Sequence, residues 1–270
     1  LGRLICIYDD NEISIEGDTD ITFTEDVPKR FEAYGWQVIK VDDGNDLEAV
    51  EKALMEGRRD SEHPTLIVLR THIAYGSPNK QGSHDAHGAP LGDEEVRLTK
   101  GCLGCDADAV FCVTDAVREH CRQVVAKGEG AEAAWQEKYK AYAATHPALS
   151  DAWLNALSGF MPRGWDADLA DLTPGDGPMA TRAASGKALN TLAGRIQTLM
   201  GGSADLAPSN KTYLVAESVF QKDNYSGRNI RFGVREHAMG AIMSGMFLHG
   251  GIRPYGGTFL VFADYLRPSI

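Results

Sequence analysis

The sequence predicts an α/β protein with mainly parallel sheets flanked by helices, built as two modules. In residues 4–70, short apolar runs alternate with stretches of helical periodicity, as in β-α-β units. In residues 230–240, an apolar strand runs directly into a helix of small residues, so that Glu236 stands at a strand-to-helix junction. Between these regions, residues 147–179 lose periodicity and gather Pro, Gly and Asp, which is typical of a connection between modules.

The first module is predicted from its alternating pattern. Strands are expected at residues 4–8, 36–41 and 65–70, of which the first is predicted to be buried on both faces and the third to be buried as well. The expected helices are one opened by Thr24-Glu-Asp and stopped by Gly35, one at residues 46–56 ended by Gly57, and one at residues 94–103. This order indicates a parallel sheet.

Polar loops follow two of these strands. Asp9, Asp10 and Asn11 end the first strand, and with the backbone of Ile13 they offer oxygen ligands for a hard cation, although an ordinary turn is favoured on this evidence alone. Residues 71–90 form a long loop with three of the eight histidines. Polar contacts to a substrate are preferred there over a metal cluster, because the histidine spacings follow no regular period, and solvated loop histidines are the simpler alternative.

The second half continues with helices expected at residues 115–125, 131–142 and 181–199. A tight polar loop at residues 201–210 and an irregular surface excursion at residues 215–227 follow. The strand at residues 230–234 then leads to Glu236. Taken alone, that carboxylate is best explained as a partner for the positive end of a helix dipole, worth about 0.3–1 kcal/mol.

Charge and hydropathy exclude several classes of partner. The net charge is −11, the Lys and Arg residues are scattered, and 43% of residues are hydrophobic. Neither nucleic acid nor a membrane surface is therefore an expected partner, and no apolar run approaches the roughly 20 residues that cross a bilayer. An anionic small substrate would need a local cationic pocket.

Five cysteines provide no even disulfide framework, which favours a reducing compartment, and the cytoplasm is the expected location. Reduced, partly buried thiols are preferred over a zinc site formed by Cys102, Cys105, Cys112 and Cys121. The chain opens without Met in a strand pattern and stops after an apolar stretch, so both modules are expected to be incomplete.

Four stretches together resemble the transketolase family of thiamin-diphosphate enzymes. They are YDDNEISIEG at residues 8–17, HDAHGAPLG at residues 84–92, GGSADLAPSNKT at residues 201–212, and REHAMG at residues 235–240 with the segment that continues to Tyr265. Their order and similar spacing make the resemblance specific, and it covers essentially the whole chain.

The resemblance implies a division of the chain. Residues 1–148 would be the later part of a diphosphate-binding module, residues 149–180 a linker, and residues 181–270 the early part of a pyrimidine-binding module. Asn11 and the carbonyl of Ile13 match the family's ligands for Mg²⁺ or Ca²⁺, and Ile15 and Ile73 match positions that pack against the thiazolium ring.

The resemblance also assigns catalytic and substrate-binding roles. Glu236 matches the glutamate that shares a proton with the cofactor's aminopyrimidine, and Asp205 matches an acidic position of the cofactor site. An aromatic wall around the pyrimidine is implied for Phe259, Phe262 and Tyr265. His87 matches a histidine that touches both diphosphate and substrate. Arg182 and Ser209 match a phosphate-binding pair for sugar phosphates.

The family's reaction transfers a two-carbon ketol unit from a ketose phosphate to an aldose phosphate in the pentose phosphate pathway, in a homodimer whose active site lies at the subunit interface. Related thiamin enzymes (dihydroxyacetone synthase or deoxyxylulose-phosphate synthase) and a non-catalytic transketolase-like fragment are the alternatives. Cys105 and Ser244 depart from the residues common in the family, which concerns local packing. A polypeptide of this length alone is expected to be inactive.

Overall fold

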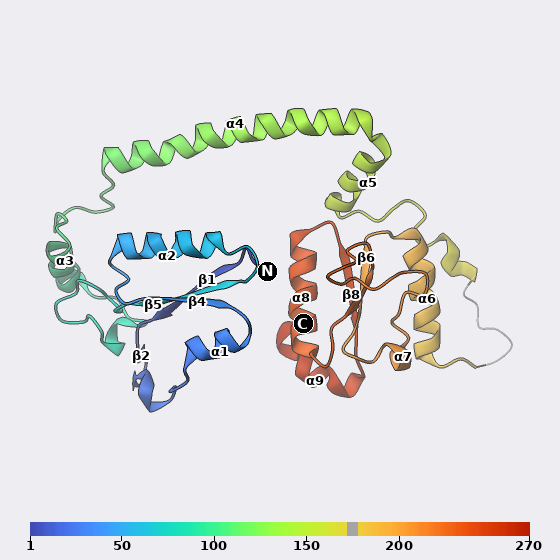
Figure 1. Cartoon of the computed structure of the whole chain (residues 1–270), viewed down its shortest axis with the longest axis horizontal. Helices are drawn as coiled ribbons and strands as arrows, with labels where there is room; N and C mark the ends of the chain where they lie inside the picture. The colour runs from blue at the N-terminus through green and yellow to red at the C-terminus, as the bar shows by residue number, and fades with distance from the viewer. Residues whose placement is uncertain (172–177) are drawn as a thin grey trace. The chain divides into compact units, whose positions relative to one another are not determined.

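The computed structural model describes residues 1–171 and 178–270, so part of the predicted linker, residues 149–180, lies outside the described residues. The chain divides into two compact units, Leu1–His120 and Cys121–Ile270, shown from blue to red in Figure 1. Each unit contains its own sheet, as the sequence predicts for an α/β protein.

The first unit is built on three parallel strands. They are β1 (Ile5–Asp10), β4 (Gln37–Val41) and β5 (Thr65–Arg70), in the order β1-β5-β4. The central strand β5 is buried from Thr65 to Val68, as its continuous apolar run predicts. β1 differs from the prediction, because Ile7 is 51% exposed: β1 pairs only with β5 among the described strands, so it is an edge.

Two helices cover opposite faces of this sheet, α1 (Val27–Ala33) and α2 (Leu47–Arg59) (Figure 1). Val27 of α1 packs with Leu66 and Val68, whereas Ala53 of α2 packs with Ile67. Successive residues of a strand point to opposite faces, so the continuous apolar run of β5 needs a helix on each side.

Helix boundaries mostly follow the predicted signals. The side chains of Asp26 and Asp46 cap α1 and α2 by accepting hydrogen bonds from Lys29 N (3.1 Å) and Ala49 N (3.0 Å). Gly57 does not end α2, contrary to the prediction. It lies in the last turn, where a Cβ atom would come within 3.1 Å of the Thr65 side chain, so this glycine serves close packing of helix on strand.

The remaining elements of the first unit are short. They are the hairpin strands β2 (Ile13–Ser14) and β3 (Gly17–Asp18), the 3₁₀ turns η1 (Thr19–Ile21) and η2 (His84–Ala86), and the helix α3 (Asp93–Cys102).

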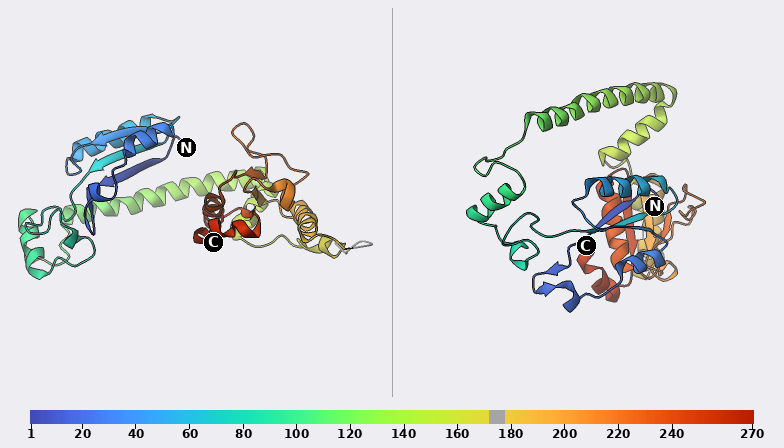
Figure 2. Two further views of the ribbon diagram at one scale, coloured as in Figure 1. Left: turned by 90° about the horizontal axis from the view of Figure 1, so that it is seen from below. Right: turned by 60° about the vertical axis from the view of Figure 1, so that its left-hand side comes forward.

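One continuous helix, α4 (Asp115–Thr145), replaces the two shorter helices predicted at residues 115–125 and 131–142, and both views of Figure 2 show its unbroken course. A second helix, α5 (Pro147–Ser158), lies where periodicity is lost in the sequence. Pro147 is tolerated there because it occupies the first turn. Trp153 of α5 packs on Trp135 and Tyr139 of α4, at ring-centroid distances of 6.1 and 5.3 Å. This tertiary contact stabilises a helix that its own pattern does not reveal.

The second unit contains the parallel sheet β7-β6-β8, with β6 (Leu199–Ser203) between β7 (Asn229–Arg231) and β8 (Arg253–Gly257). β6 was predicted to be the end of a helix and a loop. The preceding helix α6 (Thr181–Arg195) instead stops at Arg195. The helix α8 (Glu236–His249) packs on this sheet. The shorter elements of the unit are η3 (Ala167–Asp171), α7 (Ala207–Asn210), η4 (Leu260–Phe262), α9 (Ala263–Leu266) and η5 (Arg267–Ser269).

The core of the second unit lies between the sheet and α8. Ala204, Phe232 and Met239 are at most 6% exposed and pack together. Across the described residues, none of the helices is both long and apolar enough to span a bilayer.

Candidate functional site

The residues predicted to act fall into two groups, one in each unit. In the first unit they lie in the segments that follow two adjacent strands: Asn11, Ile13 and Ile15 come after β1, and Ile73 and His87 come after β5. Carboxyl ends of neighbouring parallel strands share one edge of a sheet, which is where α/β proteins bind ligands.

Asn11 forms a tight turn at this edge. Its side-chain oxygen accepts a hydrogen bond from Ile13 N (3.1 Å), and Glu12 between them has a positive φ of 56°. Arg70, at the end of β5, fixes the turn by an ion pair with Glu12 (2.7 Å) and a hydrogen bond to the carbonyl of Asp10 (2.9 Å). The ordinary turn that the sequence favours over a cation site is therefore present. It leaves the carbonyl of Ile13 and a second lone pair of the Asn11 oxygen as potential cation ligands.

A cavity of about 570 Å³ adjoins the turn. Asn11 and Ile13 line it together with Thr24, Arg70 and His72. Ile15 is 64% exposed, and Ile73 is partly buried. The lining also includes the carboxylates of Glu12, Asp18 and Asp20, so this cavity offers oxygen ligands for a cation, while Arg70 is already paired with Glu12. Arg70 was not singled out by its sequence, because an arginine at the end of a strand is not distinctive.

The histidine loop is anchored at one point. Glu95, the third residue of α3 and only 8% exposed, accepts hydrogen bonds from the hydroxyl of Ser77 and from the backbone (2.9 Å) and side-chain nitrogen (2.8 Å) of Asn79. These donors hold the pKa of the Glu95 carboxyl below its usual range. Lys80 donates to the carbonyl of Leu91 (3.0 Å) and thereby ties the middle of the loop to the segment just after it.

His87 is exposed and directly follows η2. Neither the histidine cluster nor the four-cysteine zinc site considered from the sequence assembles: in residues 1–171 and 178–270, no group of three His, Cys, Asp or Glu residues has metal-binding geometry. The five cysteines are free, and all except Cys6 are exposed rather than partly buried as predicted.

In the second unit, Glu236 is the first residue of α8 and is 8% exposed. The hydroxyl of Thr258, directly after β8, donates to its Oε1 at 3.4 Å. Within the described parts of the chain, this is the single side-chain hydrogen bond that the carboxylate receives. A nearly buried carboxylate with unused acceptor capacity at a strand-to-helix junction suits a ligand that offers a proton or an N–H group.

The predicted aromatic wall begins at the residue after Thr258. Phe259 and Phe262 lie with ring centroids 5.9 Å apart and planes inclined by 20°, and Phe262 and Tyr265 are 6.3 Å apart at 41°. Phe259 and Tyr265 are 38% and 65% exposed. Partly exposed aromatic faces beside a buried carboxylate match the needs of a flat heteroaromatic ring. Thr258 was not predicted, since a lone threonine after a glycine pair gives no signal.

A second cavity, of about 420 Å³, lies at the carboxyl ends of β6 and β7. Asp205 lines it in a left-handed conformation (φ 59°), together with Thr212, Tyr213, Arg231 and Arg235. A non-glycine residue held at positive φ is over-determined by its surroundings and is common at functional sites. The two arginines, absent from the predicted site, make this cavity cationic within an acidic protein.

Arg182 and Ser209 lie on elements that contact each other. Arg182 is the second residue of α6, Ser209 belongs to α7, and both are exposed. Residues of α6 (Ala183 and Gly186) and α7 (Ala207 and Pro208) line one cavity of about 490 Å³. The proposed phosphate pair therefore occupies neighbouring elements of one unit.

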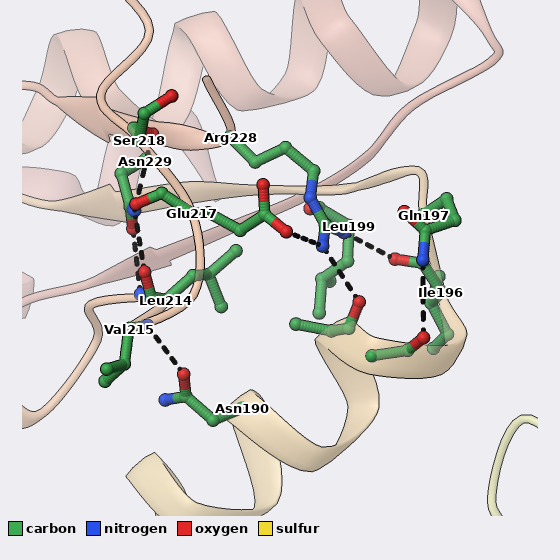
Figure 3. A network of polar contacts seen from close by, with 12 residues as sticks. Asn190, Ile196, Gln197, Leu199, Leu214, Val215, Glu217, Ser218, Arg228 and Asn229 are labelled. Atoms are coloured by element: carbon green, nitrogen blue, oxygen red, sulfur yellow. Dashed lines mark hydrogen bonds and ion pairs between the residues drawn. The ribbon is translucent and has the colours of Figure 1, made fainter. Parts of the chain in front are cut away.

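A buried polar network holds the excursion before β7, as Figure 3 shows. Arg228 donates to the carbonyls of Ala193 and Ile196 at the end of α6 (both 2.9 Å) and pairs with Glu217 (2.6 Å). Asn229, 2% exposed, binds both the N–H (2.8 Å) and the carbonyl (2.9 Å) of Leu214. The excursion is irregular, as predicted, but it is fixed to α6 and β7 by side chains that its composition does not reveal.

Two family models match the chain: "Transketolase, thiamine diphosphate binding domain" over residues 1–162, and "Transketolase, pyrimidine binding domain" over residues 177–270. Among curated proteins, the transketolases of Geobacillus stearothermophilus and Bacillus subtilis are 48% and 46% identical over the whole chain. The chain spans 40% of the length of each.

Solved structures give the same result. Transketolase from Leishmania mexicana has a TM-score of 0.91 at 42% identity, and the Pichia stipitis transketolase in complex with sedoheptulose 7-phosphate has 0.89 at 38%. Each comparison covers 99% of this chain and 40% of the other.

Proposed function

Because this chain belongs to the transketolase family, we propose that it supplies part of the cofactor and substrate site of a thiamin-diphosphate-dependent transketolase. The reaction is the transfer of a two-carbon ketol unit from a ketose phosphate to an aldose phosphate, as a step of the pentose phosphate pathway. The observation that carries the proposal is the buried carboxylate of Glu236 next to the aromatic series that starts at Phe259.

Glu236 is proposed to hold a proton against the ring nitrogen of the cofactor's aminopyrimidine. Its small exposed fraction and, among the described residues, its single, long hydrogen bond support this role, because a nearly buried carboxyl group without other partners there is free to pair with a ligand. Phe259, Phe262 and Tyr265 would stack around the ring and exclude water, and Asp205 would border the same site. When bound, thiamin diphosphate supplies the nucleophilic carbon that attacks the ketose carbonyl.

The first unit is proposed to bind the diphosphate end. The oxygen of Asn11 and the carbonyl of Ile13 would coordinate Mg²⁺ or Ca²⁺, both of which prefer oxygen ligands. Ile15 and Ile73 would pack against the thiazolium ring, and the exposed apolar side chain of Ile15 suits such a contact.

The sugar phosphate is proposed to contact three residues. The exposed side chain of His87 would donate a hydrogen bond to the diphosphate and exchange protons with sugar hydroxyls. Arg182 and Ser209 would bind the substrate phosphate through a guanidinium and a hydroxyl group. This pair would provide the local cationic pocket that an acidic protein needs for an anionic substrate.

We also propose a cytoplasmic homodimer in which residues of both subunits complete each active site. Free cysteines and the family resemblance support this proposal.

Turnover by the full-length gene product tests the function. The protein is supplied with thiamin diphosphate, Mg²⁺, a ketose phosphate and an aldose phosphate. The donor ketose should be converted to an aldose with two carbons fewer, and the acceptor aldose to a ketose with two carbons more. A folded protein whose melting temperature rises with cofactor and Mg²⁺ but which transfers no ketol unit would contradict the proposal.

A further inference from the structure

We propose that Asn190 is a positioning residue for the substrate phosphate, because it fixes the register of α6 against the segment that follows Ser209. The inference rests on the proposed function of Arg182 and Ser209 and names a residue to which no role has yet been given. Asn190 lies in the middle of α6 and is partly buried.

Asn190 connects α6 to the segment after α7 through its side-chain amide. Its side-chain nitrogen donates to the carbonyl of Tyr213 (3.0 Å), and its oxygen accepts from the N–H of Val215 (2.8 Å), the contact drawn in Figure 3. The same nitrogen also donates to the carbonyl of Gly186, one turn earlier (2.9 Å). One amide thus binds the backbone on both sides of Leu214. A side chain that pairs with two backbone groups of another segment specifies one register between them.

One turn before Asn190, the backbone of α6 comes very close to Lys211. A Cβ atom on Gly186 would lie 2.6 Å from Cβ and 2.8 Å from the carbonyl oxygen of Lys211, so α6 rests directly on this residue. Lys211 caps α7 in a left-handed conformation (φ 59°), only two residues after Ser209. Asn190 and Gly186 together therefore fix how far along α6 the end of α7 lies.

Arg182 precedes Gly186 by four residues, and residues four apart in a helix lie on the same face. Gly186 faces Lys211 at the end of α7. Arg182, one turn earlier on the same face, therefore lies on the side of α6 that contacts α7. A slip of α6 would change the separation of the Arg182 guanidinium and the Ser209 hydroxyl. Binding of one phosphate by two groups depends steeply on that separation.

The test is a double-mutant cycle in the full-length gene product, with a ketose phosphate and the same ketose without phosphate as donors. Asn190→Ala should raise KM for the phosphorylated donor about tenfold and leave KM for the unphosphorylated donor within about twofold. In an Arg182→Ala background, Asn190→Ala should add less than about twofold, since the group that it positions is absent.

Asn224→Ala is the matched control. Asn224 also binds side-chain and backbone groups of the excursion, namely Ser218 (2.9 Å) and the carbonyl of Val219 (3.1 Å), but none of its contacts reaches α6. Its kinetics should stay within about twofold of the unchanged protein for both donors. If Asn190→Ala does not fold, the isosteric Asn190→Asp, which keeps the acceptor for Val215 and loses the donor to Tyr213, carries the same test.

The two proposals fail differently. If the unchanged protein shows no preference for the phosphorylated donor, or Arg182→Ala does not reduce that preference, the phosphate role of Arg182 is wrong and the inference falls with it. A preference that depends on Arg182, together with equal KM changes for both donors in Asn190→Ala or fully additive effects in the cycle, overturns only the role of Asn190.

Discussion

Glu236 combines burial with few partners, and this combination distinguishes a carboxylate that serves a ligand from one that only caps a helix. A cap exposed to solvent would contribute about 0.3–1 kcal/mol to stability and nothing to turnover. A carboxylate that is 8% exposed and accepts a single hydrogen bond of 3.4 Å has capacity left for a further donor.

Replacement of Glu236 by Gln in the full-length gene product should therefore lower kcat by roughly a hundredfold or more, because the amide keeps the shape and loses the exchangeable proton. Steady-state kinetics at saturating thiamin diphosphate measure the loss. Thr258→Val serves as a comparison, since it removes only the long hydrogen bond, and should lower kcat less than about tenfold. Unchanged activity in Glu236→Gln would leave the helix cap as its role.

Glu217 and Arg228 provide a residue-scale prediction about pH. Hydrogen bonding by Arg228 holds the pKa of the Glu217 carboxyl below its ordinary value of about 4.3. A lowered folded-state pKa means that the stabilisation is fully present above that ordinary value and is lost as pH falls through the folded-state pKa. Glu217→Gln should lower the free energy of unfolding by about 1–2 kcal/mol at pH 7 and weaken its pH dependence below pH 4.

Urea unfolding of the chain between pH 2.5 and 7 measures both effects. Glu137→Gln is the control, because the Glu137 side chain is 74% exposed and pairs with Lys140 at 2.8 Å. Loss of this exposed ion pair should change the free energy of unfolding by less than about 0.5 kcal/mol. Equal effects of the two substitutions would show that the buried network does not stabilise the excursion.

Helices and strands were predictable from the sequence where burial imposes a regular pattern of apolar residues. β5 has four successive buried residues, and α2 has one apolar face, so both were located. β6 was missed because Leu199–Ser203 contains two glycines and no β-branched residue. α5 was missed because its packing partner, Trp135, lies on another helix. The site residues are predictions from the family resemblance, whereas Thr258, Arg70 and Asn190 emerge from tertiary contacts that no sequence spacing encodes.

Gly202 of β6 and Gly245 of α8 differ in the space around them: the first is tightly packed, and the second is open. A Cβ atom on Gly202 would lie 1.8 Å from the carbonyl oxygen of Ile230, so Gly202→Ala should distort the sheet and destabilise the chain by more than about 3 kcal/mol. A Cβ atom on Gly245 meets no described atom within 4 Å, so Gly245→Ala should stabilise α8 by about 0.5–1 kcal/mol. Thermal unfolding of the two variants distinguishes them, and destabilisation of similar size in both would contradict this account.

At the scale of the whole molecule, the chain spans 40% of the length of the transketolases that it matches. We expect the isolated 270-residue chain to show no ketol transfer under conditions in which the full-length gene product is active. A coupled assay with equal molar amounts of both proteins makes the comparison. Turnover by the isolated chain at more than about 1% of the full-length rate, roughly 2.7 kcal/mol in activation free energy, would contradict the prediction.

The strands of the two sheets occupy separate parts of the sequence, so the ribosome completes one set long before it begins the other. The three parallel strands of the first sheet lie before residue 71, and among the described residues the strands of the second sheet begin at residue 199. Chains elongate at about 5–20 residues per second, so the first sheet can pair for several seconds before the ribosome translates β6. The nascent chain should therefore acquire protease resistance in two steps, and a synonymous slow codon between the units would lengthen the interval without altering either sheet.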